Sequence, residues 1–171
     1  METILVSLVS LALIIVSSVT MAINTLQSTN KVADSWKQME AQSSNIIRTD
    51  IIALPPQHYT GGAIDLTVAN EGQTNLSKFT EWDVIVQYQT GNVSYLTYTP
   101  TYPPGNDNEW TVEAIYSSGE TPEIFDPGVL DPGEQMIVSI VLNPEIVSGE
   151  TCKITISTPN GVKSQTQVTR E

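Results

Sequence analysis

The chain begins with an unbroken apolar run. No charged residue occurs from Thr3 to Asn30, and the segment from Ile4 to Ile23 is apolar apart from five Ser and Thr residues. This run reaches the roughly 20 residues that a helix needs to cross a bilayer core, whereas a cleavable secretory signal usually has about 7 to 15. No small-residue cleavage site is obvious after it. The pattern therefore predicts a membrane-spanning helix that the working protein retains.

The small polar residues of this run gather on one side of the predicted helix. At 100° per residue they fall within a sector of roughly 100°, which Ile14 and Met21 interrupt. Such a stripe lets neighbouring helices approach closely and hydrogen-bond; alternatively, each hydroxyl bonds to a carbonyl of its own helix. We favour helix–helix packing. The predicted assembly positions are Leu5, Ser7, Ser10, Ile14, Ser17, Ser18, Met21 and Thr25.

Beyond Ile23 the pattern becomes amphipathic without a break. The apolar positions are Leu26, Val32, Trp36 and Met39, and the charged ones between them are Lys31, Asp34, Lys37 and Glu40. All ten glycines and all ten prolines lie at or beyond Pro55. One helix that continues to about Ser43 would be roughly 60 Å long, about twice the thickness of a bilayer core. That length favours a helix that enters a bundle of helices over a simple anchor.

From Ile46 the apolar period changes to that of β-strands. Eight short strands are expected, in "IIRTDIIAL", "GGAIDLTVANEG", "WDVIVQY", "VSYLTYT", "EWTVEAIY", "EQMIVSIVL", "CKITIST" and "VKSQTQVT". Asn160-Gly161 between the last two is a strong hairpin pattern. The prediction is an α+β chain, with a helix over 1–45 and an immunoglobulin-like antiparallel β-sandwich over 46–171. A barrel is the alternative.

The net charge and the residue types present limit the classes of function that this chain can have. The net charge is −12, and nearly all of it lies in the β part, which argues against nucleic acid as a partner. Cys152 is the only cysteine and fits a packed strand position, and His58 is the only histidine. No phosphate-binding loop, nucleophile elbow or zinc-ligand cluster occurs. We therefore expect neither an enzyme nor a cofactor.

A few polar positions allow a second interpretation. Two Asp-Pro-Gly segments place Asp126, Asp131 and Glu134 where they could bind Ca²⁺, although chain-reversing turns are the favoured interpretation. Asn75 and Asn92 begin sequons for N-glycosylation beside predicted turns. Glu81 and Asp83 flank Trp82. In a strand these two carboxylates would share a solvent-facing side.

This arrangement resembles that of archaellins, the subunits of the archaeal-type flagellum. The resemblance spans the chain: a start that opens directly into a hydrophobic helix, then a sandwich with "LTVANEGQTNL", "LDPGEQMIVSIVL" and "GETCKITISTPNG". Bacterial type IV pilins are less similar, because Leu5 stands where they usually have Glu, the helix lacks Gly and Pro, and one cysteine cannot close a loop. No leader with basic residues is present, so we infer that Met1 is the first mature residue.

The resemblance implies a structural subunit that polymerises with copies of itself into a filament for swimming. It also implies storage in the cytoplasmic membrane before assembly, and partners that include a prepilin-peptidase-like enzyme and an assembly and motor machine. Two alternatives stay open: an adhesive type IV-like pilus subunit, and a membrane-anchored, stator-like accessory protein.

Overall fold

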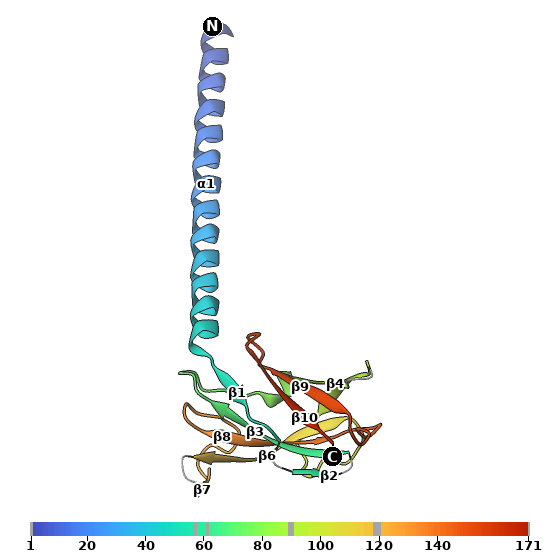
Figure 1. Ribbon diagram of the computed structural model, residues 1–171. Coiled ribbons are helices and arrows are strands. Elements are labelled where there is room, and N and C mark those ends of the chain that lie inside the picture. Colours follow the sequence, from blue (N-terminus) through green and yellow to red (C-terminus); the bar gives the residue numbers. More distant parts are fainter. Residues whose placement is uncertain (1, 57, 61, 89–90, 118–120, 171) are drawn as a thin grey trace. The chain divides into compact units, whose positions relative to one another are not determined.

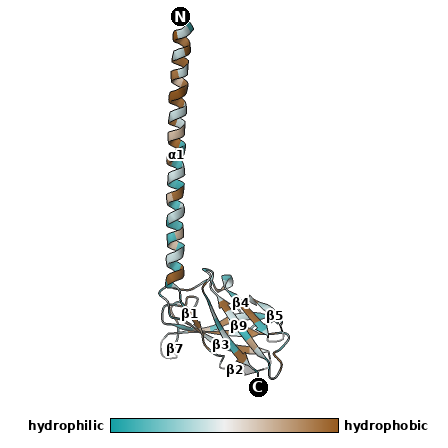
Figure 2. Ribbon diagram, turned by 45° about the horizontal axis from the view of Figure 1, so that its top comes forward, coloured by the Kyte–Doolittle hydropathy of each residue, from teal (hydrophilic) through white to brown (hydrophobic). Residues whose placement is uncertain are grey.

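The computed structural model describes residues 2–56, 58–60, 62–88, 91–117 and 121–170 (Figure 1). It begins with one helix, α1 (Glu2–Arg48). The expectation for Met1 lies outside the described residues. Figure 2 shows that the N-terminal half of α1 is predominantly apolar and that its second half is mixed. The helix has no interruption, as the absence of glycine and proline predicts.

The helix ends later than the expected boundary near Ser43. Its last turn contains Ile46 and Ile47, whose spacing fits a helix as well as a strand. Only the final part of "IIRTDIIAL" is extended, as β1 (Ile51–Ala53). Arg48 supplies a cation in the last turn, where the helix dipole favours positive charge. The backbone contacts divide the chain into two units, Met1–Ser43 and Ser44–Glu171, so the final helical turn belongs with the sandwich.

The sandwich unit consists of two groups of strands. In the first group, β1, β3 (Ala63–Asn70), β8 (Gln135–Val141) and β6 (Glu109–Ser117) follow one another, with β2 (His58–Thr60) paired to β3 and β7 (Thr121–Pro122) paired to β6. The second group has the order β5 (Val93–Tyr98), β4 (Asp83–Tyr88), β9 (Thr151–Ser157) and β10 (Lys163–Thr169).

One short parallel pairing joins the two groups. Thr97 pairs with Glu109 and Tyr98 with Trp110, between β5 and β6. All the other named strand pairs are antiparallel. At the other edge, the Ala53 N–H donates to Ser164 Oγ at 2.9 Å, which ties β1 to β10. The result is a mostly antiparallel sandwich with barrel-like closure, and the expected α+β fold is confirmed.

Two of the ten strands were not expected from the sequence. β2 has three residues and β7 has two, one of which is Pro122. Such short segments carry too little alternation to be recognised, and proline is unusual inside a strand. The hairpin at Asn160-Gly161 is confirmed: Gly161 has a φ of +87°, and its N–H donates to Thr158 O at 2.9 Å.

The core follows from the alternation of apolar residues along the strands. Inward-facing positions of β3, β4, β6, β8 and β9 are almost completely inaccessible to solvent. The largest fully buried side chains are Trp110, Ile64, Leu66, Leu130, Met136, Ile140, Ile146, Ile154 and Ile156. Cys152 is buried among them, as a packing residue would be, and burial raises the pKa of its thiol to about 11.

A polar cluster fixes the end of α1 to the loops of the sandwich. The Thr49 hydroxyl, on a residue only 5% exposed, lies 2.7 Å from Asn45 O and 2.9 Å from Thr74 Oγ1. It also accepts a hydrogen bond from Asn160 Nδ2 at 2.8 Å. Gly72 has no room for a side chain, because a Cβ there would come within 2.6 Å of Arg48 O. One hydroxyl thus links the helix end, the loop after β3 and the β9–β10 hairpin.

We expect Thr49→Val to lower the free energy of unfolding of the sandwich by about 1–3 kcal/mol, because the hydrogen bonds of the buried Thr49 hydroxyl to Asn45, Thr74 and the half-buried amide of Asn160 are all lost. Urea unfolding of the full chain in detergent, followed by tryptophan fluorescence, measures this. Thr155→Val is the matched control, since Thr155 is half-buried on β9 and no hydrogen bond of its side chain is found in the described structure. Equal midpoints for the two variants would contradict the role given to Thr49.

Candidate assembly surface of the N-terminal helix

The apolar half of α1 is not buried against any other part of its own unit. Thirteen large apolar residues between Ile4 and Ile23 are between 48% and 73% exposed. Full burial of such a side chain is worth about 1.5–3 kcal/mol, so their removal from water stabilises by some tens of kcal/mol. Among the described residues, α1 is the helix that is long and apolar enough to cross a membrane. This half is therefore apolar enough to lie in a bilayer or to pack against other helices.

Four of the five hydroxyls among the predicted assembly positions donate to their own helix, and no such bond is found for Ser17 in the described structure. Ser10 Oγ lies 2.9 Å from Val6 O, Ser18 Oγ lies 2.8 Å from Ile14 O, and Thr25 Oγ1 lies 2.9 Å from Met21 O. Ser7 bonds in the same way to the Thr3 carbonyl. The hydroxyl protons are thereby satisfied without a partner helix, as the alternative interpretation requires. Each oxygen can still accept a hydrogen bond, and the residues are small enough for a second helix to approach.

The predicted assembly positions all lie on the solvent-accessible surface of α1. Leu5 is 68% exposed, Ile14 is 63% exposed and Met21 is 73% exposed. The hydroxyl residues Ser7, Ser10, Ser17, Ser18 and Thr25 are exposed as well. Helical geometry places Leu5 roughly opposite the hydroxyl stripe, so the predicted set covers two sides of the helix. Their role in packing stays a prediction.

The amphipathic part of α1 is also uncovered within its unit. Trp36 is 72% exposed, Met39 is 69% exposed and Val32 is 53% exposed. These three side chains lie within about 60° of one another around the helix axis. An aromatic residue and two aliphatic neighbours on one face are typical of a helix that packs against another helix.

The two Asp-Pro-Gly segments form β-turns. The Val129 N–H donates to Asp126 O at 2.9 Å, and the Glu134 N–H donates to Asp131 O at 3.1 Å. The second turn has Gly133 at a φ of +87°, as a type II turn with proline before glycine requires. In the described part of the chain, no group of three or more His, Cys, Asp or Glu side chains is arranged to hold a metal ion. The geometry supports the interpretation of these segments as turns.

The carboxylate of Glu134 is the most buried acid of this region, at 8% exposure. Its Oε2 accepts the Asp131 N–H at 2.8 Å. Burial is the main cause that raises the pKa of Glu134; the bond from the Asp131 N–H opposes this rise, and the nearby Glu123 carboxylate adds to it. The Glu123 carboxylate accepts the Phe125 N–H at 2.7 Å, and this bond holds the pKa of Glu123 below its usual value. The two acids therefore brace their own loops.

Three further sequence predictions can be placed. Asn75 and Asn92 are both exposed, the first between β3 and β4 and the second just before β5.

The expectation that Glu81 and Asp83 lie together on one strand is wrong. Residues Phe79–Glu81 form a 3₁₀ turn, because Lys78 has a left-handed φ of 56° and the Trp82 indole donates to Ser77 O at 3.1 Å. Glu81 instead lies 3.5 Å from Lys78 in a surface ion pair.

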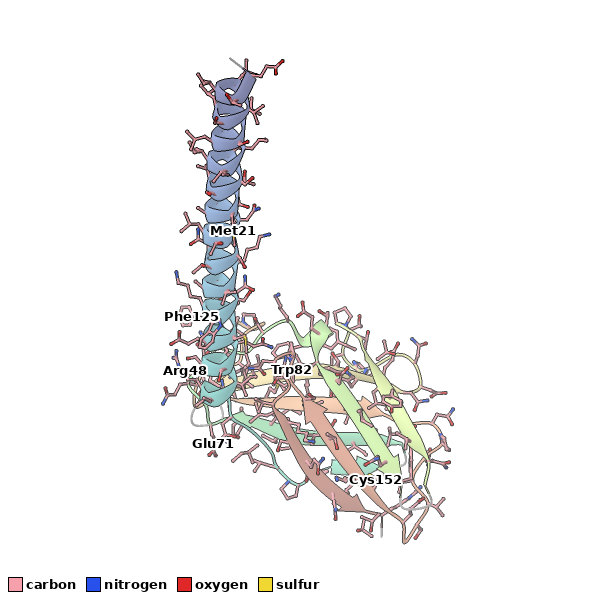
Figure 3. All side chains as sticks on the ribbon, turned by 90° about the horizontal axis from the view of Figure 1, so that it is seen from above. Met21, Arg48, Glu71, Trp82, Phe125 and Cys152 are labelled. Carbon is pink, nitrogen blue, oxygen red and sulfur yellow. The ribbon has the colours of Figure 1, made fainter. Side chains whose placement is uncertain are left out.

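Sequence reasoning missed two exposed apolar residues. Ile124 is 79% exposed and Phe125 is 93% exposed, on the loop between β7 and β8. The sequence indicates the exposure of these two residues only weakly. The apolar pair "IF" lies between Glu123 and Asp126 in a segment without strand alternation. Figure 3 labels Phe125 among the side chains.

We expect Glu134→Gln to raise the free energy of unfolding at pH 7 and to have no effect below the ordinary carboxyl pKa of 4.5. The raised pKa means that the folded chain binds this proton more tightly than the unfolded chain, so the ionised form costs stability as pH rises through this window. Glutamine keeps the acceptor for Asp131. Denaturant midpoints from pH 3 to 8 test this, with the exposed Glu71→Gln as control. A midpoint lowered at pH 7 would refute the prediction.

No family model matches the sequence, and no curated protein matches it. Solved structures do match. The archaellum periplasmic stator protein FlaG from Sulfolobus acidocaldarius is 20% identical, with a TM-score of 0.54 over 70% of this chain and 99% of that one. The archaeal flagellin FlaB1 from Methanocaldococcus jannaschii is 12% identical, with a TM-score of 0.55 over 71% and 90% of the two chains.

A third match extends further along the chain. The archaeal flagellum of Methanospirillum hungatei strain JF1 is 14% identical, with a TM-score of 0.52, and the match covers 95% of this chain and 91% of that one. At these identities the likeness shows a shared fold. The chain has an archaellin-like fold, a long apolar N-terminal helix followed by a mostly antiparallel β-sandwich, which it shares with solved components of the archaellum.

Proposed function

We propose that this chain is the structural subunit of an archaellum-type filament, polymerised through α1. One observation carries the proposal. The match to the Methanospirillum flagellum covers 95% of the chain, more than the sandwich unit alone can supply, so it includes most of the helix. The apolar helix and the sandwich thus occur together in a solved filament subunit.

The physical mechanism follows from the exposed helix. Before assembly, the segment from Ile4 to Ile23 lies in the cytoplasmic membrane and the sandwich lies outside it. A prepilin-peptidase-like enzyme and an assembly machine act on the subunit there. The subunit is then extracted, and its helix exchanges lipid contacts for contacts with other helices. The amphipathic part, with Trp36 and Met39, extends the helical core beyond the thickness of a bilayer.

The sandwich forms the exterior of this filament. Its acids keep neighbouring filaments apart in solution, because nearly all of the net charge of −12 lies in this part. Neighbours of known structure are structural proteins of the archaellum, which supports a non-enzymatic role. Rotation of the filament by a membrane motor would produce swimming.

A stator-like accessory protein is the second candidate. The FlaG match has 20% identity and covers 99% of that chain, and FlaG also occurs in a complex of FlaF and FlaG that this chain matches with a TM-score of 0.53. In that role the helix would remain in lipid, and the sandwich would act beside the filament. An adhesive pilus subunit would share the whole architecture with the filament subunit.

Electron microscopy of sheared surface filaments, with N-terminal sequencing of their subunits, separates the two roles. We expect this chain as the major filament component. Recovery of the chain only from the membrane fraction, at low copy number, would overturn the filament proposal and favour the accessory role. Loss of swimming with retained adhesion in a deletion strain would assign motility.

The helix stripe provides a second test. We expect Ser10→Leu and Ser17→Leu to reduce filament yield by at least about tenfold, because a branched side chain in a close helix contact costs about 1–3 kcal/mol. Membrane insertion should not be impaired, since leucine is more apolar than serine. Both are measured by fractionating sheared filaments and membranes.

Ala12→Leu is the matched control for these variants. Helical geometry places Ala12 on the side of α1 opposite the stripe, and the same leucine side chain is introduced there. Normal filaments from all three variants would refute the stripe as a packing surface. Equal losses from all three would show that every side of the helix is packed.

A further inference from the structure

Two surface regions of the sandwich differ sharply in charge. The segment from Thr121 to Glu134 contains four acids, Glu123, Asp126, Asp131 and Glu134, and no basic residue. The strands β5, β4, β9 and β10 instead contain two lysines, Lys153 and Lys163, and one acid, Asp83, which gives a net charge of +1 on a chain of −12. The sandwich therefore has an acidic loop and a sheet face that is not acidic.

The outward face of these four strands also exposes apolar groups. Residues Val84, Val86, Leu96, Cys152, Ile154 and Ile156 point into the core, so their neighbours along each strand point outward. Tyr95 is 74% exposed and Val93 is 45% exposed. The register places Val93 opposite Gln87, and Gln87 opposite Lys153. A lysine thus lies two strands away from this apolar pair, about 10 Å at the usual strand spacing.

The acidic loop also combines exposed apolar side chains with a charged one, and its charge is opposite to that of Lys153. Ile124 and Phe125 are 79% and 93% exposed, and Asp126 follows directly. The loop is held in shape by its own hydrogen bonds, the Phe125 N–H to Glu123 Oε1 at 2.7 Å and the Val129 N–H to Asp126 O at 2.9 Å. These bonds fix the backbone of the loop, and the exposed aromatic side chain that it carries can bury a large apolar area on binding.

The two regions cannot meet within one molecule. Figure 3 shows Phe125 and Cys152 on opposite sides of the sandwich, and Lys153 directly follows Cys152 on β9. A contact between the loop and the sheet face therefore requires two copies of the chain. Such a contact is heterologous, because it joins different patches of the two molecules. Each copy can therefore bind a further copy, which generates a ring or an open helical polymer.

We propose that the loop 123–126 of one copy docks on the outward face of β5, β4 and β9 of the next copy. Phe125 packs on Tyr95 and Val93, and Asp126 lies beside Lys153. This inference rests on the proposed filament and adds to it a contact between sandwiches, separate from the contacts of the helices. The apolar contact contributes affinity, and the opposite charges fix the orientation.

Cross-linking tests the pairing of the two surfaces. Phe125→Cys and Tyr95→Cys are introduced together into the full chain, and cells and sheared filaments are treated with a short bismaleimide. We expect a ladder of dimers, trimers and higher oligomers, which neither single variant gives. Cys152 contributes no background, because it is buried and burial raises the pKa of its thiol to about 11.

The control pair is Glu71→Cys with Tyr95→Cys, since Glu71 is exposed on a different loop of the sandwich. A ladder from this pair, or none from the first pair in intact filaments, would overturn the proposed contact while leaving the filament itself in place. Membrane extracts are treated in parallel. A ladder found there in the absence of any filament would support the contact and refute the proposed function.

Charge reversal tests the electrostatic half of the contact. We expect Lys153→Glu or Asp126→Lys to lower the assembled fraction at least about tenfold, equivalent to 1.4 kcal/mol, and the combination to recover most of it. Glu71→Lys is the control for the added positive charge and should have no effect. Wild-type assembly by both single variants, or no recovery in the combination, would refute the pairing of Asp126 with Lys153.

Discussion

The fold depends on one constraint: the apolar half of α1 cannot remain in water. Thirteen large apolar side chains between Ile4 and Ile23 lie uncovered on a single helix, and no other part of unit 1 can cover them. The free energy of their burial, some tens of kcal/mol, exceeds the usual stability of a whole domain. The apolar half of α1 is therefore suited to a bilayer or to a bundle of helices.

The sandwich has a hydrophobic core of its own and also holds the end of the helix. Its apolar residues close a core between two groups of strands around Trp110. The Thr49 hydroxyl then connects the end of α1 to Thr74 and Asn160, which come from loops far apart in the sequence. The final helical turn is thus part of the folded sandwich, although it continues a helix built for other surroundings.

The charged residues of the sandwich have two kinds of role. A strongly acidic exterior keeps the domain soluble, and the few basic residues are confined to a small number of places. Glu123 and Glu134 act inside their own turns, as loop braces. Glu81, expected on a strand with Asp83, belongs instead to a short turn that the Trp82 indole fixes. Local hydrogen bonds of this kind leave no periodic trace in a sequence.

The sequence by itself determined the long helix, the sandwich and the hairpin at Asn160-Gly161, because an apolar run, strand alternation and turn residues are local properties. It also marked the hydroxyl stripe, which the structure places on the surface of α1. Only the tertiary structure decided where α1 ends, how β5 pairs with β6, and that Phe125 is exposed. Each of these depends on contacts between residues distant in the chain, for which neither period nor composition carries information.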